Sequence, residues 1–267
     1  MDVSGKLVVI TGASQGMGAS TSLALGSQGA RVILVARTEA KLQAIADQIT
    51  AAGGEAHVRP CDLSDPASVT ALGEDVVRSL GVPDVIINNA GAGRWLAVDE
   101  TPLEEAVQMM QAPYFAAFFV TRVFLPAMIE RRSGLIVNVQ SPMSRVVAGG
   151  CTGYAACRWA LRGFNEGLRA DLRGTGVKVT EVMFGEVTSD YWENNPGAKE
   201  RLPGIANVLI PTMTTQQVGA AMIKAIRAER RVFMRPFMLT VTVGLLWMFP
   251  GVVRWLTVST GWQRGGG

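Results

Sequence analysis

The sequence of 267 residues has few of the side chains that bind metals or form disulfides. It contains one histidine, His57, and three cysteines, Cys61, Cys151 and Cys157. These four positions lack the close, regular spacing of a zinc site, so we expect no metal centre. An odd and sparse set of cysteines is typical of free thiols in a reducing compartment.

The sequence also shows no cluster of basic residues and no leader pattern in its first residues. The 25 Lys and Arg residues against 22 Asp and Glu residues give a net charge of +3, but they are scattered through the chain. We therefore expect no nucleic-acid partner. The first residues, MDVSGKLVVITG, contain no extended apolar segment ahead of a small-residue cleavage site. We expect no secretory signal and a cytoplasmic location.

No internal repeat, low-complexity linker or break in composition occurs before residue 230. What the chain does contain is a series of short β-branched runs, separated by stretches of helical composition. The runs are LVVIT (7–11), RVILVA (31–36), HVRP (57–60), DVIIN (84–88), LIVNV (135–139) and VKVTEV (177–182). Strands this uniformly apolar are covered on both faces. We therefore expect an α/β fold, a Rossmann-type doubly wound parallel sheet with helices on both faces, in a single domain.

A glycine-rich turn follows the first predicted strand. Residues 11–18 read TGASQGMG, and the helical stretch ASTSLALGSQG comes next. Glycine permits a tight turn and a close backbone approach, and a helix N-terminus offers unpaired N–H groups to a pyrophosphate. The turn therefore predicts a dinucleotide site at the carboxyl ends of the strands. The residues expected to contact the dinucleotide are Gly12, Ser14, Gln15, Gly16, Met17 and Gly18.

Several motifs in the same order resemble the short-chain dehydrogenase/reductase family. They are the TGxxxGxG spacing at 11–18, Asp62 after the third strand, NNAG at 88–91, Ser141 after the fifth strand, and Tyr154. The resemblance runs from about residue 5 to residue 190. It implies an NAD(P)-dependent oxidoreductase that assembles as a homodimer or homotetramer.

The resemblance also implies further cofactor contacts. They are Asp62 and Leu63 at the adenine, Asn89, Ala90 and Gly91 along the cleft, and Gly185, Val187 and Ser189 near the nicotinamide. Phe184 stands where the family usually has proline, and Ser189 offers a hydroxyl in place of a threonine that holds the carboxamide.

The tip of the second strand bears on the choice between NAD and NADP. NAD-preferring members resemble one another in an acidic residue there, whereas a 2′-phosphate requires a cation. Here the strand ends in Val35-Ala36-Arg37, with no acid. We expect NADP(H) to be preferred, with Arg37 at the phosphate. NAD(H) stays open, because Gln15 adds no positive charge to the turn and Arg37 also suits an ordinary surface.

Ser141, Tyr154 and Arg158 carry the predicted chemistry. Hydride transfer to or from a carbonyl carbon requires a proton to move on the oxygen. By the resemblance, Tyr154 supplies or accepts that proton and Ser141 orients the oxygen. In the family, a lysine four residues after the tyrosine lowers the tyrosine's pKa and holds the nicotinamide ribose, so the resemblance also implies that Tyr154 and Arg158 contact the cofactor. Arg158 stands in place of that lysine and keeps the charge, but it is planar and bulky. The spacing puts Tyr154 and Arg158 on one face of a helix predicted over 152–173.

A second departure concerns Pro113, which aligns with an asparagine that bends a helix and anchors a water in many members. Proline lacks the polar side chain but can distort the helix by itself. Three functions stay open. The first is an active carbonyl reductase or alcohol dehydrogenase, which we favour; the second is a cofactor-binding sensor or scaffold without turnover. The third is another reaction on the same fold, such as C=N reduction or epimerisation.

The C-terminal part of the chain predicts the substrate side. Residues 190–211 are turn-rich and carry aromatic and apolar side chains, as a substrate lid would. Met143 and Trp192 are expected to contact an apolar carbonyl or alcohol substrate. We assign residues 1–230 to a dinucleotide-binding catalytic domain that includes this lid, and residues 231–267 to an apolar extension.

The extension contains 18 uncharged residues between Arg235 and Arg254. This length is near the lower limit for a membrane helix, and Pro236, Gly244 and Pro250 disfavour a straight span. The alternatives are packing as a lid or oligomer contact, contact with a membrane surface through residues 236–258, and a true span.

Overall fold

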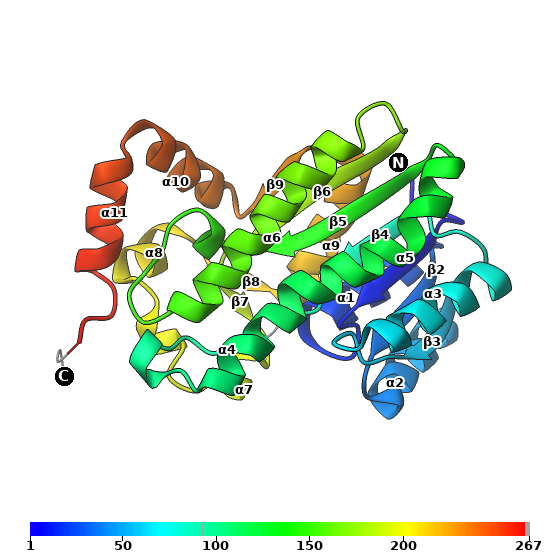
Figure 1. Cartoon of the computed structure of the whole chain (residues 1–267), viewed down its shortest axis with the longest axis horizontal. Helices are drawn as coiled ribbons and strands as arrows, with labels where there is room; N and C mark the ends of the chain where they lie inside the picture. The colour runs from blue at the N-terminus through cyan, green and yellow to red at the C-terminus, as the bar shows by residue number, and fades with distance from the viewer. Residues whose placement is uncertain (92, 265–267) are drawn as a thin grey trace.

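A parallel seven-stranded sheet forms the centre of the molecule, in the order β3-β2-β1-β4-β5-β6-β9 (Figure 1). The structure is a computed structural model that describes residues 1–91 and 93–264. The strands are β1 (Leu7–Thr11), β2 (Arg31–Ala36), β3 (Glu55–Pro60), β4 (Val85–Asn88), β5 (Gly134–Gln140), β6 (Val177–Phe184) and β9 (Val232–Arg235). The order reverses between β1 and β4, so the predicted doubly wound α/β fold is confirmed.

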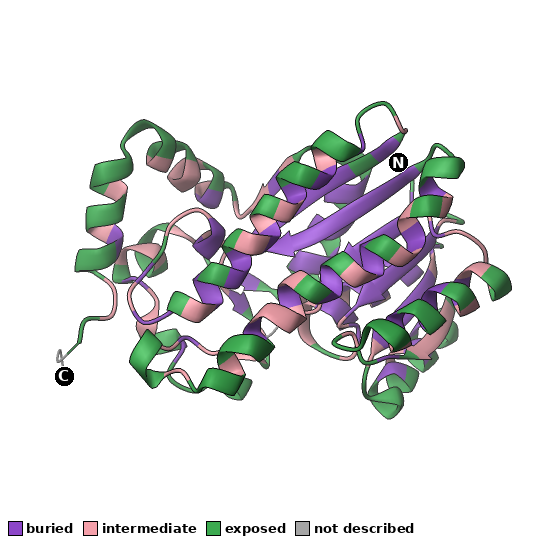
Figure 2. Cartoon of the chain, viewed as in Figure 1, coloured by how far each residue is buried: buried purple, intermediate pink, exposed green. Residues whose placement is uncertain are grey.

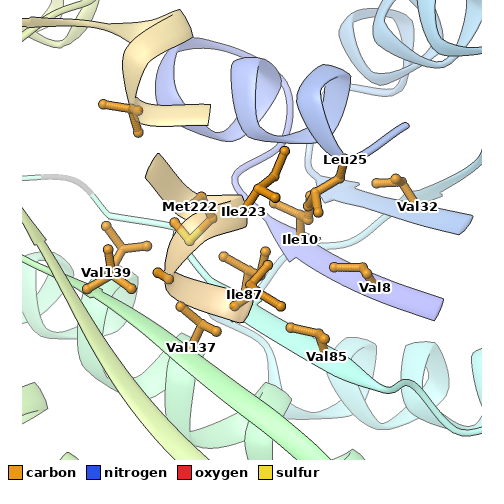
Figure 3. Packing of buried hydrophobic residues seen from close by; sticks show 14 of the residues in the cluster. Val8, Ile10, Leu25, Val32, Val85, Ile87, Val137, Val139, Met222 and Ile223 are labelled. Carbon is orange, nitrogen blue, oxygen red and sulfur yellow. The ribbon is translucent and has the colours of Figure 1, made fainter. Parts of the chain in front are cut away.

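Helices cover both faces of the sheet, because alternate strand residues point to opposite sides. Val8 and Ile10 enter one apolar core, whereas Leu7 and Val9 enter the other. The first core, part of which is shown in Figure 3, lies against α1 (Gly16–Gly26), α2 (Glu39–Ala51) and α9 (Thr215–Ala228). The second lies against α3 (Pro66–Ser79), α5 (Ala116–Glu130) and α6 (Thr152–Asp171). Strands buried on both sides explain the near-continuous apolar runs in the sequence.

The seventh strand was not predicted from the sequence. β9 pairs in parallel with β6, with Val232 opposite Glu181. Because this strand lies beyond residue 230, the sheet continues to Arg235. The run VFMR is short and lies in a basic stretch, so no local pattern distinguished it from a loop.

A helix of 28 residues, Leu103–Glu130, is long and apolar enough to cross a membrane by length and composition, since 18 of its consecutive residues have a mean hydropathy of 1.5. It consists of α4 (Leu103–Met110), a π-helical turn η2 (Gln111–Phe115) and α5. Its side chains Val120, Phe124 and Met128 are buried in the second core. Pro113 lies within the π-helical turn. Since proline cannot donate a backbone hydrogen bond, it suits the helix distortion expected there.

Short elements follow the sixth strand. The segment expected to form a lid contains α7 (Tyr191–Asn194), η4 (Lys199–Arg201) and α8 (Gly204–Leu209). It lies between β7 (Val187–Thr188) and β8 (Met213–Thr214), which pair with each other. The remaining 3-10 turns are η1 (Val98–Glu100) and η3 (Pro142–Ser144).

The apolar run after Arg235 folds as two helices, α10 (Phe237–Met248) and α11 (Pro250–Ser259), that bend by 119°. The bend lies at Phe249 and Pro250, in keeping with the break that proline was expected to cause. The run therefore does not form a straight span. Figure 1 shows the two helices as an arch beside α8, away from the sheet.

We predict that Gly18→Ala destabilises the fold by ~1–3 kcal/mol, as overpacking does. A Cβ at position 18 would lie 2.1 Å from the carbonyl oxygen of Gly12, so the β1–α1 turn would have to open. Gly163→Ala is the matched control, since it too is a glycine within a helix but has no neighbour within 4 Å of the added carbon. It should be neutral or stabilise by ~0.5–1 kcal/mol. Urea unfolding measures both, and equal stabilities would contradict the close approach.

Candidate active site

A cavity of about 180 Å³ lies at the carboxyl ends of the strands, where the fold predicts a ligand. Residues that follow β4, β5 and β6 form its inner wall, and the segment around α7 and α8 forms its outer wall. Of the predicted site residues, those lining it are Met17, Asn89, Gly91, Ser141, Met143, Tyr154, Arg158, Gly185, Val187, Ser189 and Trp192. The structure therefore brings the three predicted catalytic residues together with both predicted substrate contacts.

The glycine-rich turn after β1 is held against the residues that follow β4, the neighbouring strand in the sheet. Asn89 Nδ2 donates to the carbonyl oxygens of Thr11 (3.0 Å) and Gly12 (3.3 Å). The backbone N–H of Ala90 donates to Thr11 Oγ1 (3.0 Å). Gly12 and Gly16 have φ values of +65° and +56°, which favour glycine. The turn is thus fixed in a conformation that no Cβ at these positions would permit without strain.

The turn leads directly into α1, whose first backbone N–H groups suit an anion. Gln15 is the N-cap, and its side chain does not cap the helix. Gln15 Oε1 instead accepts a hydrogen bond from Lys41 Nζ at 3.3 Å. Lys41, which reaches the turn from α2, was not predicted from the sequence. Together with the space kept by Gly18, these groups fit the pyrophosphate of a dinucleotide.

Arg37 and Asp62 lie away from the main cavity, on an open depression beyond the tips of β2 and β3. Hydrogen bonds from the backbone and the side chain of Ser64 lower the pKa of Asp62, and the charge of Arg37 contributes. Asp62 is therefore an anion at neutral pH. Leu63 packs at the edge of the second core. These predicted adenine-end residues are thus neighbours in space.

Tyr154 and Arg158 lie on one face of α6, as the spacing predicted. The side chains are almost fully buried, and the Arg158 Cζ atom lies 5.0 Å from the centre of the Tyr154 ring. Arg158 Nη1 donates to the carbonyl oxygen of Val139 (3.1 Å), and Gln140 Nε2 donates to the carbonyl oxygen of Arg158 (2.8 Å). These hydrogen bonds hold Arg158 at the end of β5, with its guanidinium against the Tyr154 ring.

The charge of Arg158 is maintained in spite of burial. Burial acts to lower the pKa of the guanidinium, but the side chains of Tyr154, Cys157 and Tyr191 outweigh it, so the pKa lies above its ordinary value. Arg158 is consequently a cation at any pH of interest. Gly91 leaves the space that the guanidinium occupies, since a Cβ at position 91 would lie 2.8 Å from Arg158 Nη2.

Ser141 begins the turn η3 at the end of β5. Its Oγ accepts a hydrogen bond from the backbone N–H of Met143 (3.3 Å). A buried ion pair anchors the turn to β6: Nη2 of Arg145, the residue directly after the turn, lies 2.7 Å from Oε1 of Glu181. The Glu181 side chain is completely buried. The pair anchors the segment that carries Ser141, and neither of its members was predicted from the sequence.

Aromatic side chains close the cavity around Tyr154. The centre of the Trp95 ring lies 5.6 Å from the centre of the Tyr154 ring and 6.4 Å from the centre of the Trp192 ring. Tyr191 Oη donates to the carbonyl oxygen of Gly93 (2.8 Å), and burial raises the pKa of Tyr191 far above its usual value. Trp95 was not predicted, because it lies in an irregular segment with no motif.

The three cysteines are free and buried, as predicted. Burial raises the pKa of both Cys61 and Cys151 to about 11 and also raises that of Cys157. At neutral pH these thiols are protonated and poor nucleophiles. The cavity is therefore equipped for proton transfer by hydroxyl groups beside a fixed cation.

Comparisons with known sequences agree with this geometry. Residues 6–200 match the family model described as short chain dehydrogenase. An uncharacterized oxidoreductase of Mycobacterium tuberculosis is 34% identical over 244 residues, which cover 88% of this chain and 68% of that protein. A fatty acyl-CoA reductase of the same organism is 41% identical over 194 residues, which cover 69% of this chain and 64% of that protein.

A solved structure is similar over nearly the whole fold. It is that of a metagenomic short-chain oxidoreductase in complex with NADP, with a TM-score of 0.72 and 29% identity. The match covers 88% of this chain and 96% of that one. Motifs, fold, cavity and relatives lead to one conclusion: the chain belongs to the short-chain dehydrogenase/reductase family and is an NAD(P)-dependent oxidoreductase.

Proposed function

We propose that the protein is an NADP(H)-dependent reductase or dehydrogenase of apolar carbonyl or alcohol substrates. One observation carries this proposal: Ser141 and Tyr154 line the same cavity, and a buried guanidinium lies against the Tyr154 ring. A tyrosine hydroxyl in this setting is a proton donor whose conjugate base is stabilised by a fixed positive charge.

Each of the three residues then has one role in reduction. A nicotinamide cofactor held in the cleft would provide the hydride for the carbonyl carbon. Ser141 donates a hydrogen bond to the carbonyl oxygen and so orients it. Tyr154 gives its proton to that oxygen as the hydride arrives, and Arg158 balances the negative charge left on the tyrosine. In oxidation the proton moves in the opposite direction.

The cavity wall supports an apolar substrate. Met143 and Trp192 line the same cavity as the reacting groups, and Trp95 extends the aromatic surface. We keep residues 190–211 as the substrate lid, because this segment contributes side chains from α7 and α8 to the wall. The relative named as a fatty acyl-CoA reductase makes fatty acyl thioesters and fatty aldehydes the first substrates to test.

NADP(H) is favoured by charge at the adenine end. No acidic residue ends β2, and Arg37 follows that strand. A cation at this position suits a 2′-phosphate better than a bare ribose. The similar metagenomic enzyme has NADP bound, while NAD(H) stays the alternative cofactor.

We also propose a homodimer or homotetramer in the cytoplasm. Val107, Phe115 and Phe118 expose apolar surface along α4, the π-helical turn and α5, which suits contact with a second copy. Light scattering during gel filtration measures the assembly.

We predict that Tyr154→Phe abolishes most turnover without weakening NADPH binding. Loss of a positioned proton donor lowers kcat by about 10²–10⁴-fold. NADPH consumption with fatty aldehydes, fatty acyl-CoA and apolar ketones measures turnover, and NADPH fluorescence measures binding. Tyr114→Phe is the matched control and should keep full activity, because Tyr114 packs among phenylalanines outside the cavity. Equal activity of both variants would refute the assigned role of Tyr154.

We predict that Arg37→Ala raises the Kd for NADPH roughly tenfold to hundredfold and leaves that for NADH nearly unchanged. The expected loss corresponds to one charge-assisted hydrogen bond. Arg78→Ala, at an exposed arginine on α3, controls for the change in net charge. Titration by fluorescence measures each Kd. If Arg37→Ala weakened both cofactors alike, the phosphate contact would be excluded.

A further inference from the structure

The two C-terminal helices expose an unusual amount of apolar surface. Of the 18 exposed large hydrophobic side chains among the described residues, eight lie in this segment. They are Phe237, Leu245, Trp247, Met248, Phe249, Val252, Trp255 and Val258. In α10 and α11 only Leu239 and Thr257 are buried. Figure 2 shows both helices largely exposed. We call residues 236–259 the C-terminal hairpin.

The bend concentrates this surface at its apex. Trp247, Met248 and Phe249 lie directly at the 119° break between the helices, and Trp247 is 84% exposed. Trp255 follows on α11 and is 66% exposed. Tryptophan and phenylalanine are the side chains that bury themselves at the boundary between lipid headgroups and acyl chains. Each helix alone is too short to cross a bilayer, so the apex suits shallow insertion.

The chain after Glu229 carries charge of one sign; of its arginines, Arg235 directly precedes the hairpin and Arg254 lies within it. After Glu229 the described chain contains no acidic residue, whereas it contains five arginines, Arg230, Arg231, Arg235, Arg254 and Arg264. Arg231 and Arg264 pair with Glu166 and Asp99, and Arg254 has no ion-pair partner among the described residues. Such a surface attracts anionic lipid headgroups. A symmetric contact between two copies would instead bring like charges together.

The hairpin is connected to the cavity. The backbone N–H groups of Gly204 and Ile205, at the start of α8, donate to the carbonyl oxygen of Thr260 (2.8 Å) and to its Oγ1 (3.3 Å). Ala206 and Asn207 of α8 line the cavity. The end of α11 is thus joined to the outer cavity wall.

We propose that the C-terminal hairpin docks on an anionic lipid bilayer, with its aromatic apex inserted at the headgroup level. Arg254 in the hairpin and Arg235 directly before it contact the lipid phosphates. Docking brings lipid to the side of the molecule that carries α8, and apolar substrates dissolved in the bilayer then reach the cavity past α8. This last step rests on the proposed function, whereas docking itself does not.

The test is co-sedimentation of the full chain with vesicles of phosphatidylcholine and phosphatidylglycerol. Binding is expected to these vesicles, with weaker binding in high salt or to phosphatidylcholine alone. Trp247→Ser and Trp255→Ser should each lower the partition coefficient about tenfold. Arg254→Gln should lower it about fivefold on anionic vesicles only. Leu103→Ser is the control, because Leu103 is equally exposed but lies on α4.

The proposal is overturned if the protein stays in the supernatant, or if Leu103→Ser loses as much binding as the tryptophan variants. A different result also overturns it: neither the unmodified protein nor Trp247→Ser binds vesicles, and Trp247→Ser dissociates an oligomer in gel filtration. The hairpin would then contact a second copy of the chain. Thermal unfolding confirms that each variant is folded. Turnover of a fatty aldehyde carried in the vesicles is measured separately, so that binding without turnover contradicts only the proposed function.

Discussion

The buried guanidinium of Arg158 is the constraint on which the active site depends. A charge inside a protein is costly unless polar groups surround it. Here the carbonyl oxygen of Val139 accepts one hydrogen bond from the guanidinium, the Tyr154 ring packs against it and Gly91 provides the space, while Arg158 Nε has no hydrogen-bond partner among the described residues. One side chain thereby fixes the end of β5, the catalytic face of α6 and the turn after β4 relative to one another.

The remaining parts of the site are arranged around this charge. The glycine-rich turn, clasped by Asn89, occupies one side and suits the cofactor. The aromatic wall around Trp95 and the segment with α7 and α8 occupy the other side and suit an apolar substrate. The buried ion pair of Arg145 and Glu181 holds the turn that carries Ser141, between the cofactor side and the substrate side. A rigid sheet thus supports the reacting groups, while the substrate side is built from short elements.

Much of this was predictable from local pattern. The six apolar runs, the glycine-rich turn and the helix carrying Tyr154 all follow from periodicity and residue type, because their burial is decided by neighbours in sequence. Lys41, Trp95 and Glu181 were not predictable, since each acts through tertiary contacts that leave no local signal. β9 was missed because its short run lies among arginines. The distortion at Pro113 was expected from the resemblance, in which an asparagine bends the helix at that position, and from the chemistry of proline.

Single-turnover hydride transfer at saturating NADPH tests the central claim most directly, because cofactor affinity then drops out of the measured rate. Stopped-flow absorbance of NADPH compares the unmodified protein with Arg158→Lys and Arg158→Met. If the fixed charge beside Tyr154 supports the reaction, Arg158→Lys stays within about tenfold and Arg158→Met slows roughly hundredfold or more. A folded Arg158→Met variant that transfers hydride as fast as the unmodified protein would contradict the account.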